Sequence, residues 1–476
     1  MSGMLVHQGE KSWRSGAGRT RRIGSFLLYP FLVVCGGSLA VGAVFASFYV
    51  GLAFLLAGVL LTLIAQSQLP GKALADASLA AFMLGVVVAA LIYFGYMGDY
   101  GEPFWVPGAD DQVFEQVATR LYNGHFATVF DMFASSDSYL RQHNSKGWVM
   151  GLVYLMHIGD ALDGYHSMVP RILNVFVLNA LAMVVVKCFA RRYATSEKWL
   201  CIMYLSLALM PNALVISSHI YRDTVSAFLV VGCYFLALEI CERRAVVRNV
   251  VLIGVFAYCS YWLRSMNLFF IAGLVAAAVL PPILKRLKTN VAVVGAAIVA
   301  AAAGLVLFAG YGDQMIAYIS RYGDRIASGE SRFVSLIYGL PLLPIGLPLR
   351  MVAYLCSPFY YRILFDPASW FASTESITHL LATVGTIVLA AHYVYVCRGI
   401  REDGRTGLAL LIVLVGICIS TSGYRHIMMV YPLLVLLIAE GMYALKSEPE
   451  KRVVYRTAAL LVGLVLCSAF GLVSLV

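Results

Sequence analysis

The sequence predicts an all-α integral membrane protein, a polytopic bundle of about thirteen transmembrane helices. Its 476 residues are 61% hydrophobic and only 13% charged, and the mean hydropathy is +0.82. A soluble domain is nearer half apolar and a quarter charged, so the apolar excess must face lipid. Apolar stretches of about 20 residues, the length that crosses a bilayer as a helix, recur from Ile23 to Val476.

The apolar stretches also divide the chain into segments. The stretches expected to cross the membrane are residues 23–43, 48–65, 73–97, 168–188, 199–216, 224–240, 249–262, 267–284, 291–311, 377–397, 407–421, 427–445 and 453–476. The segments are a basic tail (1–22), two N-terminal helices (23–72), a helical module (73–311) with a large loop (98–167), a second large loop (312–376) and C-terminal helices (377–476).

The second large loop contains an apolar stretch that is broken by Pro341, Pro344 and Pro348. Proline-broken backbone at membrane depth must be buried in protein or line a cavity. We therefore expect this stretch to be re-entrant or to lie at the interface. If it crossed fully, the basic loop after residue 397 would move outside.

Positive charge sets the expected orientation. The basic N-terminus has no cleavage-site pattern after it, so the first apolar stretch is expected to be a retained anchor. With the N-terminus in the cytoplasm, 23 of the 35 Lys and Arg residues fall in cytoplasmic loops, as the positive-inside rule requires. The same rule explains the net charge of +10, so no nucleic-acid partner is expected. The 10 cysteines are scattered without a CxxC pair, which favours small buried hydrophobes over disulfides or a zinc site.

The cations expected outside are almost all arginine. They are Arg120, Arg141, Lys146, Arg171, Arg222, Arg264, Arg321, Arg325, Arg332, Arg350, Arg362 and Arg425. Arginine grips phosphate with two parallel hydrogen bonds and tolerates partial dehydration, so this set suggests an anionic ligand. The alternative is that the arginines pair with outer acids or with lipid headgroups. Arg222, Arg264 and Arg425 lie at outer helix ends and are the first candidates for a phosphate site.

A short amphipathic helix is expected in the first large loop, over residues 108–124. Its apolar residues fall on one helical face, and Asp110 and Asp111 stand at its start. An aspartate there is an ordinary N-cap that suits the helix dipole. It is equally suited to catalysis, and one of the pair could cap while the other reacts.

The motifs around this helix resemble those of the GT-C fold glycosyltransferases, which include protein O-mannosyltransferases and aminoarabinose transferases of lipid A. The acid pair Asp110-Asp111 is followed by Phe114, Ala118 and the turn Asn123-Gly124. The segment 218–223, with Arg222 and Asp223, is similar to the start of a later helix in bacterial relatives. Tyr424-Arg425-His426, with Pro432 and Gly441 after it, is similar to their C-terminal helix. The chain departs from the family in its two extra N-terminal helices.

This resemblance implies an enzyme of the bacterial inner (plasma) membrane with its active site on the outer face. It implies inverting transfer of a sugar from a polyprenyl-phosphate or polyprenyl-diphosphate donor to a glycan or glycolipid acceptor in envelope synthesis. Asp110 is then the first choice for the base and Asp111 the second. Arg222, Arg264 and Arg425 would then bind the donor phosphate, and Arg350 and Arg362 would line its approach. Asp223, His219 and His426 would support the same site. Some members use a divalent cation, which here would be held by Asp110 and Asp111.

Two other functions remain open from the sequence. An O-antigen-type polysaccharide polymerase would also join polyprenyl-linked sugars outside, without depending on the acid pair. A transporter or flippase of a lipid-linked or anionic solute would place charges at mid-membrane depth on discontinuous helices. Here the charges gather in the outer loops and at helix ends, which favours chemistry at the surface. The acids Glu239 and Glu440, near inner helix ends, are expected to be solvated or to snorkel.

Overall fold

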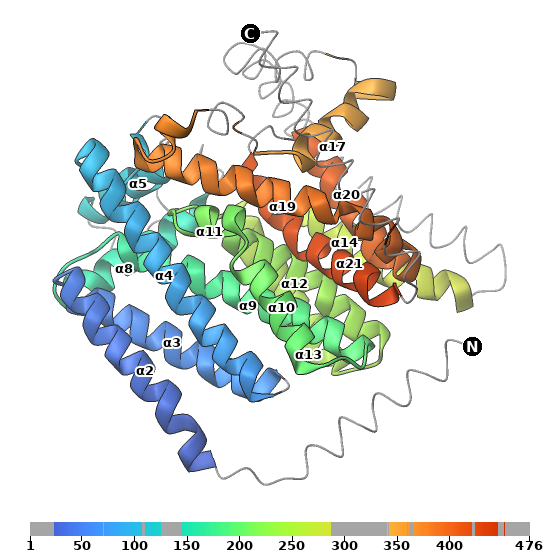
Figure 1. Cartoon of the computed structure of the whole chain (residues 1–476), viewed down its shortest axis with the longest axis horizontal. Helices are drawn as coiled ribbons and strands as arrows, with labels where there is room; N and C mark the ends of the chain where they lie inside the picture. The colour runs from blue at the N-terminus through green and yellow to red at the C-terminus, as the bar shows by residue number, and fades with distance from the viewer. Residues whose placement is uncertain are drawn as a thin grey trace. The chain divides into compact units, whose positions relative to one another are not determined.

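The computed structural model describes residues 23–69, 71–106, 110–124, 145–286, 340, 342–358, 360, 366–420, 424–445 and 452. Within these ranges the secondary structure is helical and contains no β-strand (Figure 1). The helices are α2 (Ile23–Val44), α3 (Phe48–Gln68), α4 (Lys72–Tyr100), α5 (Asp110–Asn123), α8 (Lys146–Asp160), α9 (Met168–Arg192), α10 (Glu197–Ala208), α11 (Pro211–Ser217), α12 (Asp223–Cys241), α13 (Val246–Leu263), α14 (Asn267–Arg286), α17 (Leu347–Leu355), α19 (Thr374–Glu402), α20 (Gly404–Ser420) and α21 (Tyr431–Ala444). Short turns of π- or 3₁₀-helix form η2 (Leu342–Gly346), η3 (Pro367–Ser369) and η4 (Tyr424–Met429).

Six of these helices are long and apolar enough to cross a membrane, namely α3, α4, α9, α12, α13 and α19. The bent pair α10 and α11 makes a seventh if it is one span. Large apolar side chains on their surfaces are exposed, such as Leu91 on α4 and Val247 and Tyr258 on α13, as lipid-facing residues are. The chain is a multi-pass, all-helical membrane protein.

The expected number of thirteen spans is not established by the described residues. Two of the expected spans, 291–311 and 453–476, lie outside them. Four others form apolar helices that are shorter than a full crossing, within α2, α14, α20 and α21. The proline-broken stretch of the second large loop forms η2 and α17, the latter with two apolar residues exposed, Leu349 and Val352.

The described helices belong to two compact units. Unit 1 comprises residues 1–228, 259–265 and 362–385, and unit 2 comprises 229–258, 266–361 and 386–476. Within unit 1, α3 packs against α2, α4 and α9, and α10 packs against α4 and α9 (Figure 1). The N-terminal helices α2 and α3 are therefore part of the same packed bundle as α4, α9 and α10.

Hydrogen bonds between distant residues show which helix ends of unit 1 lie together. The Thr374 N–H donates to Asp99 (2.7 Å), which joins the start of α19 to the end of α4. The Arg222 guanidinium donates to the Leu263 carbonyl (3.1 Å), which joins the start of α12 to the end of α13. We call this end of unit 1 the α5 end, because it also carries α5 and α8.

The opposite end of unit 1 is fixed by a long-range cap. The Glu197 carboxylate accepts from the Leu74 N–H (3.2 Å) and so caps the start of α4 from the start of α10. Gly71 stands before α4 with φ of +90°, and a Cβ there would lie 2.0 Å from the Glu197 carboxylate oxygen. A side chain at this position would both strain the backbone and displace the cap.

The span expected over residues 199–216 is broken. α10 and α11 meet at a bend of 51°, and Pro211 starts α11. Proline lacks the N–H that would continue the preceding helix, so the chain turns at this point. α11 then leads directly into the turn that carries Arg222.

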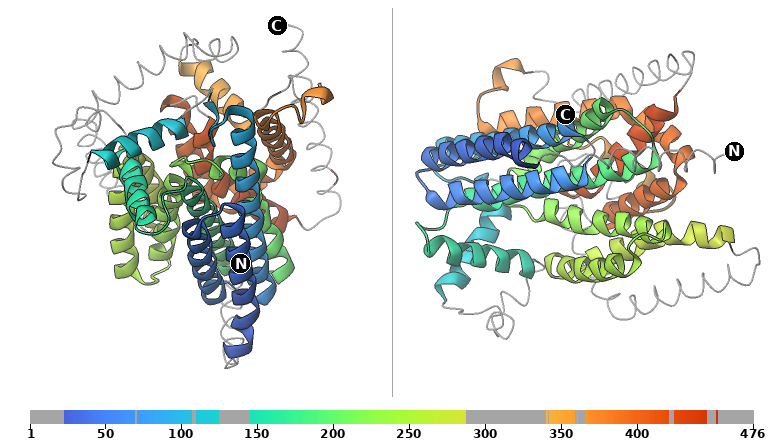
Figure 2. Two further views of the ribbon diagram at one scale, coloured as in Figure 1. Left: turned by 90° about the vertical axis from the view of Figure 1, so that its left-hand side faces the viewer. Right: turned by 90° about the horizontal axis from the view of Figure 1, so that it is seen from below.

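α5 and α8 form a layer of their own at the α5 end. α5 runs across the direction of α3 and α4 in both views of Figure 2, as an interfacial helix does. Its apolar face packs on α8 through Phe114, Val117 and Leu121, which meet Val149 and Val153 in one buried cluster. The helix expected over 108–124 is confirmed, whereas α8 was not anticipated as a separate element.

Unit 2 contains α14, α17, α20, α21 and η4, with α20 packed on α14, α17 and α21. α20 begins with a cap in which Asp403 accepts from the Arg405 N–H (3.1 Å) and the Thr406 hydroxyl. The Tyr234 hydroxyl lies 2.9 Å from the Thr406 hydroxyl. Glu440 of α21 has none of its surface exposed, so the expectation that this acid is solvated is wrong. Its helical neighbours from Tyr431 to Gly441 are buried as well, which leaves it no path to water.

Candidate functional site

The two aspartates at the start of α5 lie in different environments. Asp110 is exposed, whereas Asp111 has 0% of its surface exposed. One Asp111 carboxylate oxygen accepts from the Gln112 N–H (3.0 Å). The other, Oδ2, is buried and has no hydrogen-bond partner in the described part of the chain. A buried carboxylate oxygen without a partner costs free energy, which calls for a functional explanation.

Arg222 lies next to this helix. Its guanidinium carbon is 5.7 Å from the centre of the Phe114 ring, one turn after Asp111 on α5. The same guanidinium donates to the Leu263 carbonyl, and Arg264 is the next residue in the chain. Arg264 is buried, with 6% of its surface exposed. The structure thus brings Arg222 to the helix that carries the acid pair and places the Arg264 backbone beside the group that holds Arg222.

The turn before Arg222 is fixed by side chains from two other helices. Asn174 of α9 donates to the carbonyls of His219 and Tyr221, at 2.8 Å each. The Trp148 indole of α8 donates to the Ile220 carbonyl (3.0 Å). The turn lies between α11 and α12, where side chains take the place of a helical hydrogen-bond ladder. The position of Arg222 therefore depends on α8 and α9.

Arg171 of α9 ties the same turn to the segment after α4. One guanidinium nitrogen donates to the Ser218 carbonyl (2.8 Å) and the other to the Pro103 carbonyl. The side chain has 0% of its surface exposed and lies 5.7 Å from the Phe104 ring centre. Its Nε has no hydrogen-bond partner among the described residues. An arginine buried to this degree holds its surroundings in one arrangement, because moving it would leave its charge unpaired.

Two supporting residues lie close to the turn. His219 is buried, with its Nδ1 2.7 Å from the Val215 carbonyl and its ring stacked on Tyr221 at 4.9 Å. A carbonyl only accepts, so Nδ1 is the nitrogen that donates in this hydrogen bond. Asp223 is buried in the first turn of α12, where its charge suits the positive end of the helix dipole.

Glu115 is a further acid at the α5 end that the sequence did not single out. It lies one helical turn after Asp111. Burial raises the pKa of Glu115 to about 7, the Arg171 guanidinium opposes the rise, and Asp111 and Glu102 add to it. Burial and the Glu115 carboxylate raise the pKa of Tyr165 well above its ordinary value. Glu115 therefore changes its charge close to neutral pH.

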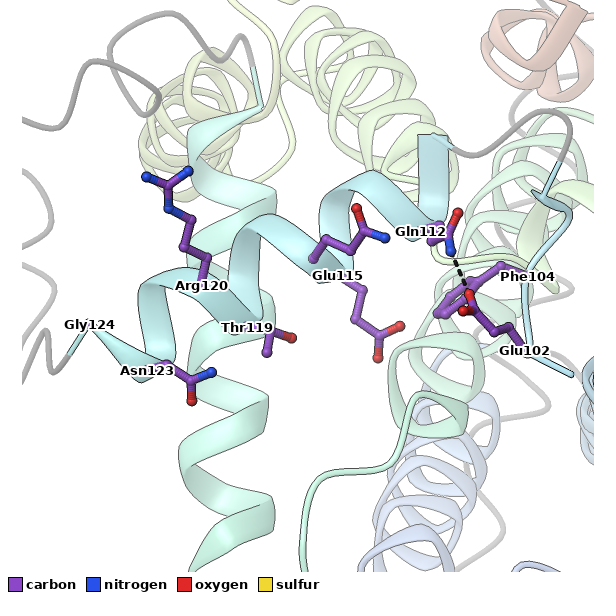
Figure 3. Close-up of a pocket in the computed structure, with 9 residues that line it drawn as sticks. Glu102, Phe104, Gln112, Glu115, Thr119, Arg120, Asn123 and Gly124 are labelled. Atoms are coloured by element: carbon purple, nitrogen blue, oxygen red, sulfur yellow. Dashed lines mark hydrogen bonds between the residues drawn. The ribbon is translucent and has the colours of Figure 1, made fainter.

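A hollow of about 780 Å³ runs along the other face of α5 (Figure 3). The described residues that line it come from α5 and from the segment after α4: Glu102, Phe104, Gln112, Glu115, Gln116, Thr119, Arg120, Asn123 and Gly124. The Gln112 amide donates to the Glu102 carboxylate across it. Figure 3 shows Thr119 and Asn123 on one side of the helix and Arg120 extending from the other.

The remaining candidates are distributed differently. Arg425 and His426 lie in η4 and Arg350 in α17, all in unit 2. Arg425 and Arg350 are partly buried, and His426 is buried with 6% exposed. Arg362 lies outside the described residues. Convergence of these residues with the acid pair stays a prediction.

The described residues offer few groups that could coordinate a divalent cation. They contain no group of three or more His, Cys, Asp or Glu residues that could hold a metal ion. Asp110 and Asp111 are consecutive on α5, so their side chains project about 100° apart. One is exposed and the other buried, and this pair does not present two carboxylates to one ion.

The sequence contained signals for the features that were missed. α8 shows Val149, Leu152, Val153 and Met156 at helical spacing, and all four are buried. Glu115 could have been found from its place one turn after Asp111. Arg171 was among the outer arginines, but nothing in its local sequence distinguished it from the others.

A comparison of the chain with protein-family models, with curated proteins and with solved structures finds no match in any of the three.

Proposed function

We propose that this protein is a membrane glycosyltransferase of the GT-C type that uses a polyprenyl-phosphate or polyprenyl-diphosphate sugar. The observation that carries the proposal is Asp111, which is completely buried and has one carboxylate oxygen without a partner within the described residues. The Arg222 guanidinium, from the turn before α12, lies over Phe114, one turn after Asp111 on α5. A carboxylate and a guanidinium at one end of the helix bundle are the two groups that displacement of a lipid phosphate requires.

In the proposed reaction, the hydroxyl oxygen of the acceptor attacks the anomeric carbon of the donor sugar. The bond from that carbon to the phosphate oxygen breaks, and the configuration inverts. The Asp111 carboxylate takes the proton from the attacking hydroxyl. The Arg222 guanidinium stabilises the negative charge that develops on the leaving phosphate, and Arg264 adds positive charge nearby. The burial of Asp111 is the reason to prefer it to Asp110 as the base, since little water competes for the proton.

The site is expected on the outer face of a bacterial inner membrane, with a glycan or glycolipid as acceptor. A polysaccharide polymerase uses the same donor class and would differ in making products of many lengths. The bend between α10 and α11 is the one observation that favours a transporter, because discontinuous helices form transport sites. Residues 208–217 around the bend contain no charged residue, which a site for an anionic solute would need.

The test uses purified full-length protein in nanodiscs with a panel of radiolabelled undecaprenyl-phosphate sugars. We expect one of these donors to release its sugar, either to added membrane-lipid acceptor or slowly to water, and Asp111→Asn to abolish the release. Proteoliposomes loaded with the same donors provide the opposing measurement. Movement of the donor across the bilayer without cleavage of its sugar–phosphate bond would replace the enzyme with a flippase.

A further inference from the structure

The hollow along α5 has the chemistry of a binding site for sugar hydroxyl groups. Its walls carry amide side chains from Gln112, Gln116 and Asn123 and the hydroxyl of Thr119. Amides and hydroxyls both donate and accept hydrogen bonds, as the hydroxyl groups of a glycan do. Phe104 also borders the hollow, but only 6% of its surface is exposed, so the amides and the hydroxyl define its chemistry.

The charges in this hollow are nearly balanced. Among the described residues that line it, Arg120 is the one cation, against the carboxyl groups of Glu102 and Glu115. The Gln112 amide already engages the Glu102 carboxylate. Burial raises the pKa of Glu115 to about 7, so this group is partly neutral at neutral pH. An anionic ligand would meet more negative than positive charge here, and a polycation would find little to hold it.

The size of the hollow and its place on α5 further restrict the class of ligand that can bind there. Its volume of about 780 Å³ is within the range of about 300–1,000 Å³ found for small-molecule sites. Glu115 lines it and interacts electrostatically with Asp111, one turn earlier on the helix. A molecule held in the hollow would therefore lie along the helix that carries the proposed base.

We propose that this hollow binds an uncharged, polyhydroxylated glycan, which is the acceptor in the transfer reaction. The role of this glycan as acceptor rests on the proposed function, whereas its binding in the hollow does not depend on that function. The side chains of Gln116, Thr119 and Asn123, which are exposed on α5, hydrogen-bond the ring hydroxyls. The acceptor hydroxyl that reacts is directed past Glu115 toward Asp111.

Binding is measured by saturation-transfer difference NMR on the full-length protein in nanodiscs. The probes are tetrasaccharides of matched size: uncharged cellotetraose, maltotetraose and N-acetylchitotetraose, anionic tetragalacturonate and cationic tetraglucosamine. We expect saturation transfer to at least one uncharged probe and at least threefold less to either charged probe. Thr119→Trp should fill the hollow from an exposed position and abolish that signal. Ala161→Trp, at an exposed position after α8 that does not line the hollow, should leave it unchanged.

A charge substitution gives a second readout that does not depend on filling the space. Gln116→Lys, also at an exposed position, should shift the preference toward tetragalacturonate by at least threefold. The inference is overturned if no uncharged probe shows saturation transfer, if a charged probe binds the wild type best, or if Thr119→Trp binds as the wild type does.

Failure of the glycan-site proposal and failure of the proposed function would give different experimental results. If a polyprenyl-phosphate sugar is turned over while Thr119→Trp leaves the KM for the acceptor unchanged, the acceptor site lies elsewhere and the enzyme assignment stands. If uncharged glycans bind in the hollow but no donor is turned over, the glycan site stands and the transferase is rejected.

Discussion

The two faces of α5 differ in what surrounds their acids. On the buried face, Asp111 has no exposed surface and Phe114 packs into the cluster shared with α8. On the open face, Glu115 lines a hollow and is only partly buried. The two acids are four residues apart, yet one is buried and the other borders the hollow. Positions four apart lie only about 40° apart around the helix axis, so the border between the buried and the open face runs between Asp111 and Glu115. A single helix can therefore supply a protected base and a polar binding wall side by side.

The largest effect should come from the buried face. Asp111→Asn keeps the shape of the side chain but removes its ability to take a proton, so turnover of the donor sugar should fall by roughly 10²- to 10⁴-fold. Asp110→Asn, the exposed neighbour, should lose far less. Sugar release by the two purified variants, with melting temperatures as the control for folding, measures the difference. Equal losses in both would remove the distinction drawn from burial.

The next effect concerns the guanidinium beside Phe114. Arg222→Ala should lower kcat/KM for the donor by roughly 10- to 100-fold, since hydrogen bonds to charged groups are worth about 1.5–3 kcal/mol. Arg222→Lys should restore only part of this loss if the phosphate is held by two parallel bonds. Steady-state kinetics with the donor varied gives both numbers. Full rescue by lysine would leave charge alone as the requirement.

A smaller effect should follow from loosening the turn that presents Arg222. Asn174→Ala leaves the His219 and Tyr221 carbonyls without their donor, at a cost of about 1–3 kcal/mol in stability. Because the turn also positions Arg222, KM for the donor should rise more than kcat falls. Asn179→Ala is a matched control, since its amide donates within α9 to Val175 and not to the turn. A variant that is destabilised but has unchanged kinetics would separate the turn from the site.

The smallest effect belongs to the open face and depends on pH. The pKa of Glu115 in the folded protein is about 7, above its ordinary value of 4.5. Its contribution to stability is therefore complete below pH 4.5 and declines as pH rises toward 7. Glu115→Gln should gain stability relative to wild type between pH 5 and pH 8, by about 1–2 kcal/mol for a partly exposed group. Melting temperatures of both proteins at the two pH values measure it, and parallel curves would contradict the raised pKa.

Local patterns in the sequence were sufficient to predict where helices form but not which of their side chains are buried. The period of apolar residues over 108–124 predicted α5, and the acid after Arg222 marked the start of α12, because both are set by neighbours in the chain. Burial is decided by tertiary packing, so nothing local separated Asp111 from Asp110 or revealed that Glu440 is enclosed. Pro211 was a visible sign of the break before α11, but a continuous apolar stretch concealed it.

The contacts of Arg171 show why the rest of the site could not be predicted from the sequence. Its partners, Ser218 and Pro103, are 47 and 68 residues away in the sequence. Both partner groups are backbone carbonyls, which every residue has, so side-chain patterns carry no trace of the pairing. The same holds for Asn174 and Trp148. Arg222 was chosen from its place at a helix end, while the groups that hold it there could not be read from one sequence.

Asp163 connects the loop before α9 to the N-terminal pair of helices. Its carboxylate accepts from the backbone N–H groups of Phe48 and Tyr49, the latter at 3.0 Å, at the start of α3. Eight residues later the chain reaches Arg171. Shortening the protein by genetic truncation before residue 70 would remove the partners of Asp163 and the α3 surface on which α9 rests. A minimal version of this protein must therefore retain the hairpin formed by α2 and α3. A hybrid that exchanges this hairpin for another must supply new hydrogen-bond donors to the Asp163 carboxylate.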